Sequence, residues 1–92
     1  MYRVVPSKNF RKQVKRLVIV DKILLKKLNK VIDILCAGES PPQIFQDHKL
    51  SGKFKDFREC HIAPDWLLVY CLHKDIPVLE LLATGSLATL FE

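Results

Sequence analysis

The spacing of apolar residues changes its period once along this chain, and that change limits the folds open to it. Between residues 8 and 36 the apolar residues recur every three or four positions, which predicts two amphipathic helices. Between residues 57 and 83 they form short runs separated by turn residues, which predicts three consecutive strands. Two helices followed by a strand meander indicate an α+β domain, with the helices on one face of a mainly antiparallel sheet.

The predicted helices form a hairpin. The first is expected over residues 8–18, with Ser7 as its N-terminal cap, and the second over residues 22–36, with Asp21 as its cap. The connection between them is so short that the pair must be antiparallel. A short strand over residues 2–5 precedes the pair and is expected to join the sheet.

The three later strands are predicted over residues 57–62, 66–72 and 78–83, after a polar loop over residues 43–52. The run 66–72 is almost entirely apolar, which is typical of a central strand that is buried on both faces. Residues 84–86 are expected to end the last strand, and a helical turn or a short tail follows over residues 87–91.

The turn between the first two of these strands decides which side chains share a sheet face. If Ala63 and Pro64 are the two turn residues, His61 lies opposite Trp66 and on the same face. Asp65 then points to the other face, so a His61–Asp65 pair requires a wider or bulged turn.

A chain of 92 residues is expected to form one domain over residues 1–92. No apolar run approaches the ~20 residues that a membrane-spanning helix needs. The first residues also lack the apolar stretch of a signal peptide, so we expect a cytoplasmic protein with no membrane partner.

Positive charge is concentrated in the first third of the chain. Residues 1–30 hold ten Lys and Arg and one acid, and residues 31–92 hold five Lys and Arg and nine acids, so +9 and −4 sum to +5. Such a cluster is either a solvated helix face or a surface for DNA, RNA, an anionic membrane or an acidic protein. Its members are Lys8, Arg11, Lys12, Lys15 and Arg16 on the first helix, and Lys22, Lys26 and Lys30 on the second.

Cysteine usage favours a reducing compartment and gives little support to a metal site. The cysteines Cys36, Cys60 and Cys71 are odd in number and contain no C-x-x-C pair, so no disulfide framework is expected. Cys60 and His61 are adjacent, and in a strand they point to opposite faces. We therefore expect no metal and no other cofactor.

Three titratable residues, His48, His61 and Asp65, fall within eighteen positions near predicted loops and strand ends, with Arg58 and Trp66 among them. Each also has an ordinary structural explanation. A single histidine is usually a satisfied surface or packing residue, Asp65 suits a turn, and Trp66 suits the edge of a core.

Longer motifs connect these residues. Residues 47–52 read D-H-K-L-S-G, residues 57–70 read F-R-E-C-H-I-A-P-D-W-L-L-V-Y, and residues 84–91 read T-G-S-L-A-T-L-F. On these motifs the chain resembles the YafQ-type toxins of the RelE/ParE superfamily, which belong to bacterial type II toxin–antitoxin modules. The predicted element order agrees with the compact RelE-like fold of that family, so the resemblance covers the whole chain.

The resemblance implies an mRNA interferase, an endoribonuclease that cuts mRNA in the ribosomal A site without a metal. The ribose 2′-hydroxyl attacks the neighbouring phosphate and the leaving 5′-oxygen takes a proton, which requires a base, an acid and positive charge. The implied partners are the ribosome with its mRNA, and a cognate antitoxin. Operator DNA is reached only through the antitoxin complex.

The resemblance also implies roles for residues at matching motif positions. The expected acid–base and orienting residues are His48, His61 and Asp65; the residues that pack or stack around the substrate are Trp66 and Phe91; and Arg58 is a candidate phosphate contact or, equally, a cross-strand ion-pair partner.

Two positions depart from the family pattern. Leu87 stands where the family has a histidine, and Ala83 stands where it commonly has a basic residue, often arginine. Losing one positioned acid or base typically costs about 10²–10⁴ in rate. The chain is a variant detoxified on purpose, a naturally decayed toxin, or an enzyme that works with His48, His61 and Asp65 alone. We favour the first, because the surrounding motif is intact.

Two other functional classes stay open at this stage. One is a ParE-like toxin, which shares the fold but inhibits DNA gyrase. The other is a non-catalytic protein that binds the antitoxin and regulates the operator, a reading that Leu87 and Ala83 strengthen. In the leading class, the basic helix hairpin docks on ribosomal RNA and the sheet holds the mRNA.

Overall fold

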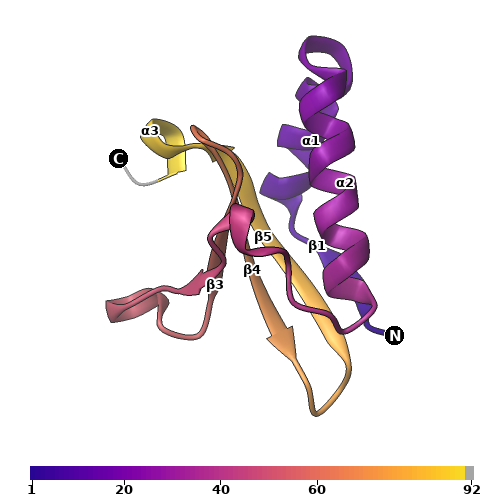
Figure 1. Ribbon diagram of the computed structural model, residues 1–92, viewed down its shortest axis with the longest axis vertical. Helices are drawn as coiled ribbons and strands as arrows, with labels where there is room; N and C mark the ends of the chain where they lie inside the picture. The colour runs from indigo at the N-terminus through magenta and orange to yellow at the C-terminus, as the bar shows by residue number, and fades with distance from the viewer. Residues whose placement is uncertain (91–92) are drawn as a thin grey trace.

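The computed structural model describes residues 1–90, which form a five-stranded sheet with two helices packed on one face (Figure 1). The strand order is β1-β5-β4-β3-β2, and β1 is parallel to β5 while the other pairs are antiparallel. The predicted α+β class with a mainly antiparallel sheet is confirmed. The strands are β1 (Arg3–Pro6), β2 (His48–Lys49), β3 (Arg58–Ala63), β4 (Trp66–His73) and β5 (Val78–Ser86).

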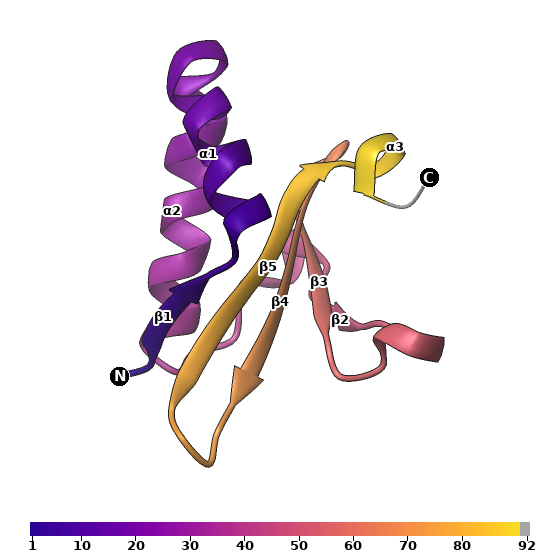
Figure 2. The same cartoon turned by 180° about the vertical axis from the view of Figure 1, so that it is seen from behind.

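The helix hairpin consists of α1 (Lys8–Val20) and α2 (Lys22–Cys36). Both predicted caps are present: Ser7 Oγ accepts the Phe10 N–H at 3.0 Å, and Asp21 Oδ1 accepts the Leu24 N–H at 3.0 Å. Asp21 is also the only residue between the helices, which makes them antiparallel neighbours (Figure 2). α1 runs two residues beyond the predicted end, to Val20.

The core lies between this hairpin and one face of the sheet. The helices contribute the apolar stripes that the spacing predicts, and β3, β4 and β5 contribute alternate residues. The buried members are Phe10, Leu17, Leu28, Val31 and Leu35 from the helices, and Cys60, Ile62, Leu68, Tyr70, Leu79 and Leu81 from the strands. Within the part of the chain that the structure describes, no helix is long and apolar enough to cross a membrane.

The prediction that residues 84–86 end the last strand is wrong. β5 continues to Ser86, because Thr84 and Gly85 pair with Leu68 and Leu67 of β4. Thr84 is fully buried, and its hydroxyl donates to the Leu67 carbonyl at 2.7 Å. Polar turn-forming residue types are thus held in an extended backbone by their neighbours. The helical turn α3 (Leu87–Leu90) follows, while Phe91 lies outside the described residues.

The predicted register of the β3–β4 hairpin is also wrong. The turn residues are Pro64 and Asp65, so Ala63 lies opposite Trp66, and a register shift between His61 and Ala63 places His61 opposite Leu67. The shift changes which side chains share a face. Trp66 packs against the core under the helices, so it does not share a face with His61.

The segment predicted as a polar loop over residues 43–52 is more structured than expected. It contains a 3₁₀ turn over Gln43–Phe45 and the two-residue strand β2, and a second 3₁₀ turn begins at Gly52. β2 pairs with β3, so that His48 lies opposite Glu59 and Lys49 opposite Arg58. His48 is therefore held on a strand at the edge of the sheet.

Candidate active site and nucleic-acid interface

Two of the three predicted acid–base residues meet on the sheet face away from the helices. His48 Nε2 lies 3.7 Å from Glu59 Oε1, and His61 Nε2 lies 3.5 Å from the same oxygen. The two imidazole rings are 6.3 Å apart between centroids. A single carboxylate thus faces both rings, and we call His48, Glu59 and His61 the histidine cluster.

Glu59 is a further candidate site residue, and its role is not predicted from the sequence. It is only 7% exposed, although it is charged. A buried carboxylate is costly unless cations or hydrogen-bond donors face it, and the two histidines are the side chains that do so here. Its position two residues before His61 could have indicated that the two side chains share a sheet face, because alternate residues of a strand point to the same face.

The backbone orients the His48 ring. Its Nδ1–H donates to the Gln46 carbonyl oxygen at 2.8 Å, in the tautomer that this geometry requires. The Nε2 atom, which lies beside Glu59, is then the ring nitrogen left to exchange a proton. A ring with one nitrogen fixed by the main chain and the other free to exchange a proton is suited to general acid–base chemistry.

Of the two positions that depart from the family pattern, position 83 lies in the same sheet row as Glu59, and position 87 begins the helical turn after β5. Glu59, Val69 and Ala83 are paired in one row across β3, β4 and β5, and His61, Leu67 and Gly85 form the next row. At a strand spacing of about 4.8 Å, position 83 is about 10 Å across the sheet from Glu59. Leu87 is half exposed and starts α3, two residues after Gly85. Neither residue supplies a charge or an exchangeable proton.

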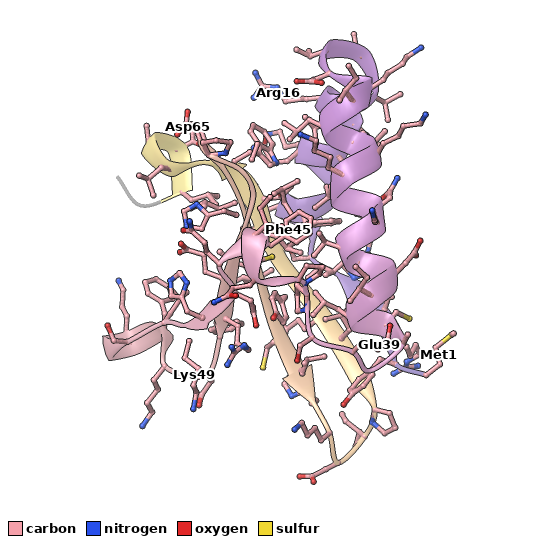
Figure 3. The ribbon with its side chains drawn as sticks, in the orientation of Figure 1. Met1, Arg16, Glu39, Phe45, Lys49 and Asp65 are labelled. Carbon is pink, nitrogen blue, oxygen red and sulfur yellow. The ribbon has the colours of Figure 1, made fainter. Side chains whose placement is uncertain are left out.

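Asp65 is not part of the histidine cluster. It is exposed in the turn at the end of the β3–β4 hairpin, beside α3, as the label in Figure 3 shows. Among residues 1–90, no hydrogen bond or ion pair joins Asp65 to His48 or His61. Trp66, the next residue, is half-buried against the core, and its indole N–H donates to Thr84 Oγ1 at 2.8 Å.

Arg58 is engaged on the opposite face of β3. Its Nε and Nη2 donate to Asp47 Oδ2 at 3.1 and 2.9 Å, and the Tyr70 hydroxyl donates to Asp47 Oδ1. The hydrogen bond to Asp47 raises the pKa of the Arg58 guanidinium. The structure thus shows the ion-pair alternative for Arg58. Since Asp47 precedes His48 and Arg58 precedes Glu59, this network also joins β2 to β3 next to the histidine cluster.

The cysteines do not present a reactive thiolate beside the histidines. Cys60 is fully buried on the helix side of β3, and burial raises the pKa of its thiol to about 12. Burial also raises the pKa of the Cys71 thiol. Both thiols therefore stay protonated at neutral pH and act as small apolar groups.

The predicted basic residues are all exposed on the hairpin. Lys8, Arg11, Lys12 and Lys15 border one shallow hollow on α1. On the α2 side, Lys27 and Lys30 border a hollow of about 570 Å³ that also reaches Phe45 and His61. Lys27 was not among the predicted contacts, although its spacing from Lys30 and its charge are visible in the sequence. This second hollow connects the basic face of α2 to the edge of the histidine cluster.

Comparison with known proteins identifies the family. Residues 2–92 match the model of a family described as bacterial toxin of type II toxin–antitoxin system, YafQ. The chain belongs to the YafQ family. The mRNA interferase toxin YafQ of Escherichia coli K12 is 35% identical to it over 68 residues, which are 73% of this chain and 72% of that toxin.

Solved structures agree with the YafQ assignment. The E. coli YafQ in a DinJ–YafQ complex superposes with a TM-score of 0.88 at 30% identity, over 100% of both chains. A toxin from Helicobacter pylori gives a TM-score of 0.87 at 42% identity, over 99% of this chain and 100% of that one. These similarities confirm the predicted family and the predicted compact α+β fold.

The H. pylori toxin is described as metal-bound. Within residues 1–90 of the present chain, no group of three or more His, Cys, Asp and Glu side chains is arranged to hold a metal ion. The residues therefore do not fit a resident metal, and the chemistry below is assigned to side chains alone.

Proposed function

We propose that this YafQ-family toxin is a ribosome-dependent mRNA endoribonuclease that uses the histidine cluster for metal-free cleavage. The observation that carries the proposal is the meeting of His48 and His61 around the buried carboxylate of Glu59. Two imidazoles on one open sheet face can serve as base and acid in a single displacement. The relative named mRNA interferase supports the same reaction class.

In the proposed reaction, one imidazole takes the proton of a ribose 2′-hydroxyl as that oxygen attacks the adjacent phosphorus. The bond from phosphorus to the 5′-oxygen breaks, and the leaving oxygen takes a proton from the other imidazole. The products are a 2′,3′-cyclic phosphate and a 5′-hydroxyl end. Glu59 acts as a positioning residue that holds both rings. Asp65 orients the RNA at the hairpin end and Phe91 packs against it, whereas Trp66 lies on the other face of the sheet and packs against the core.

Ala83 and Leu87 attenuate this reaction in the present chain. The phosphorane-like transition state carries extra negative charge, and an arginine at position 83 would extend along the row toward Glu59 to balance it. A histidine at position 87 would supply a further proton donor or acceptor. Each restored group is expected to raise the rate of cleavage by about 10²-fold or more.

The test is mRNA cleavage in a purified translation system with programmed ribosomes. Leu87→His, Ala83→Arg and the double variant should cleave faster than the parent chain, and adding His61→Gln should abolish the gain. Leu87→Asn and Ala83→Gln are the matched controls, because they change size and polarity without adding a titratable or charged group. Equal rates for Leu87→His and Leu87→Asn would contradict the role assigned to position 87.

The proposed partners follow from the charge distribution and from the relatives. The basic faces of α1 and α2 dock on ribosomal RNA, and the hollow that joins Lys27 and Lys30 to His61 guides the mRNA backbone. A cognate antitoxin binds the toxin, as DinJ accompanies YafQ in the solved complex. Operator DNA is bound through that complex, and the site of action is the cytoplasm.

A second function, antitoxin binding without catalysis, is favoured by the same two residues, Ala83 and Leu87. It predicts tight antitoxin binding together with no cleavage by the parent chain or by any restored variant. A gyrase supercoiling assay with the same preparations separates both readings from a ParE-like activity, which would inhibit supercoiling and leave ribosome-bound mRNA intact.

A further inference from the structure

The turn of the helix hairpin exposes a cluster of large aliphatic side chains. The exposed fractions are 47% for Val18, 83% for Ile19, 79% for Val20 and 73% for Ile23. We call these four residues the hairpin tip. Both ribbon views show this end of the hairpin standing clear of the sheet (Figures 1 and 2). Single exposed aliphatic residues are ordinary, but four within six positions form a patch typical of an interaction site.

The hairpin tip contributes little to the stability of the hairpin itself. The core contacts of the two helices come from Phe10, Leu17, Leu28, Val31 and Leu35, which lie on the opposite stripes. β-branched residues are also weaker helix formers than Ala, Leu or Lys. The chain therefore carries Val and Ile at exposed helical positions where smaller or charged residues would favour the helices more.

A hollow extends the apolar surface toward the sheet. Its volume is about 360 Å³, and its lining combines the apolar side chains of Val20, Leu24 and Trp66 with polar ones that include Arg16 and the capping residue Asp21. The hairpin tip and this hollow together provide a ridge and an adjacent apolar groove. Figure 3 shows Arg16 at this end of the molecule. Such a surface suits a protein segment that lays an apolar face on it.

Cations surround the hairpin tip. Lys15 and Arg16 lie four residues before Ile19 and Val20, and Lys26 lies three residues after Ile23, so each is a neighbour on the same helix face. The single acid nearby, Asp21, is occupied as the cap of α2. The occupant must therefore present apolar side chains flanked by carboxylates.

We infer that the hairpin tip binds an acidic amphipathic segment of the antitoxin. RNA would pair with the cations and leave the aliphatic side chains in water. A second copy of this chain would bring two strongly basic hairpins together, which like charge opposes. This inference rests on the proposed toxin–antitoxin function, and it adds where the antitoxin binds and which chemistry it presents.

The test measures binding of the purified antitoxin from the toxin's operon to variants of the toxin. Ile19→Ser with Ile23→Ser is expected to weaken binding by about 30-fold or more, because truncated aliphatic anchors dominate such interfaces. The matched control is Ile44→Ser with Ile76→Ser, two isoleucines that are 81% and 66% exposed elsewhere on the surface. The control should bind like the parent chain, and both variants should keep its thermal unfolding midpoint.

The inference is overturned if the tip variant and the control bind the antitoxin with equal affinity. With antitoxin binding intact, a selective loss of binding to phosphatidylglycerol vesicles would assign the tip to a membrane surface, and the loss of a self-associated dimer in sedimentation would assign it to a second copy of the chain. Cleavage assays on the Leu87→His background separate this inference from the proposed function. If the tip variant cleaves mRNA and escapes neutralisation, both stand. If the tip variant no longer binds the antitoxin, but neither the Leu87→His protein nor its tip variant cleaves mRNA, only the ribonuclease proposal fails.

Discussion

The side chains of Asp47, Arg58 and Tyr70 hold the strand that carries His48, although they lie on the face opposite the histidine cluster. Asp47 accepts two hydrogen bonds from Arg58 and one from Tyr70, so both of its oxygens are occupied. β2 is only two residues long and contributes few ladder hydrogen bonds. The network therefore supplies much of what fixes β2 against β3, and it positions His48 opposite Glu59.

Tyr70→Phe is expected to lower the free energy of unfolding by about 1.5–3 kcal/mol, because it removes a buried hydrogen bond to a charged acceptor. Urea unfolding at pH 7 measures the change. Tyr2→Phe is the matched control, since within residues 1–90 no hydrogen bond involves the Tyr2 hydroxyl, and it should change the value by less than about 0.5 kcal/mol. A similar loss in both variants would contradict the role of the Asp47 network.

The buried thiol of Cys60 is expected to make stability fall at alkaline pH. Burial raises its pKa from 9.0 to about 12, so the stabilising contribution is complete below pH 9 and is lost as the pH rises toward 12. In this window the unfolded chain loses the proton that the folded chain keeps, at a slope of up to about 1.4 kcal/mol per pH unit.

Urea unfolding at pH 7, 9 and 10.5 tests this. Cys60→Ala lowers the free energy of unfolding at pH 7, because it leaves a small cavity. Between pH 9 and 10.5, however, its free energy of unfolding should decrease less than that of the parent chain. Cys36→Ala, which keeps the buried thiol, should retain the parent's fall. The raised pKa of the buried Tyr70 hydroxyl adds a further loss that all three proteins share. Parallel curves for the two cysteine variants would rule out Cys60 as the source.

At the scale of elements, local patterns predicted the helices and central strand, whereas tertiary contacts decided the rest. The Ser7 and Asp21 caps and the apolar run of β4 need only neighbours in sequence, so they could be read directly. The β3–β4 turn could not, because the register shift after His61 depends on which residues β3 buries. The pairing of His48 with Glu59 likewise required the position of β2, which no local pattern fixes.

The junction between β5 and α3 depends on one small residue. A Cβ atom at Gly85 would lie 3.0 Å from Thr89 Oγ1 and 3.3 Å from Leu90 Cδ2. Gly85→Ala should therefore push α3 away from the sheet at a cost of about 1–3 kcal/mol, and with it position 87. On the Leu87→His background, cleavage should fall more than antitoxin binding.

Adding Thr89→Ala to Gly85→Ala removes the nearest clashing atom and should recover part of the cleavage rate. Thr89→Ala alone is the control for the loss of the two hydrogen bonds that the Thr89 hydroxyl makes with Ser86. If Gly85→Ala leaves both the unfolding midpoint and the cleavage rate unchanged, α3 does not depend on this close approach.

For the whole molecule, most of the positive charge and the candidate acid–base residues lie on different parts of the fold. The +9 segment of residues 1–30 forms most of the hairpin, and the histidine cluster lies on the far face of the sheet. In the proposed function, docking on RNA and cleavage are therefore expected to be separable by substitution. Reversing Lys12, Lys15 and Arg16 to Glu should weaken ribosome association by about tenfold or more at 0.1 M salt, because about three phosphate contacts are lost.

The matched control reverses Arg3, Lys49 and Lys74, three exposed cations outside these faces, so both triple variants change the net charge equally. If a local docking face binds the ribosome, only the α1 variant weakens, and the slope of log affinity against log salt becomes shallower by about three. If net charge alone attracts the ribosome, both variants bind it more weakly by the same factor.

Cleavage by the Leu87→His form at saturating ribosome concentration should persist in the α1 variant, because the histidine cluster is unchanged. Loss of cleavage there would show that α1 also aligns the mRNA over His48 and His61.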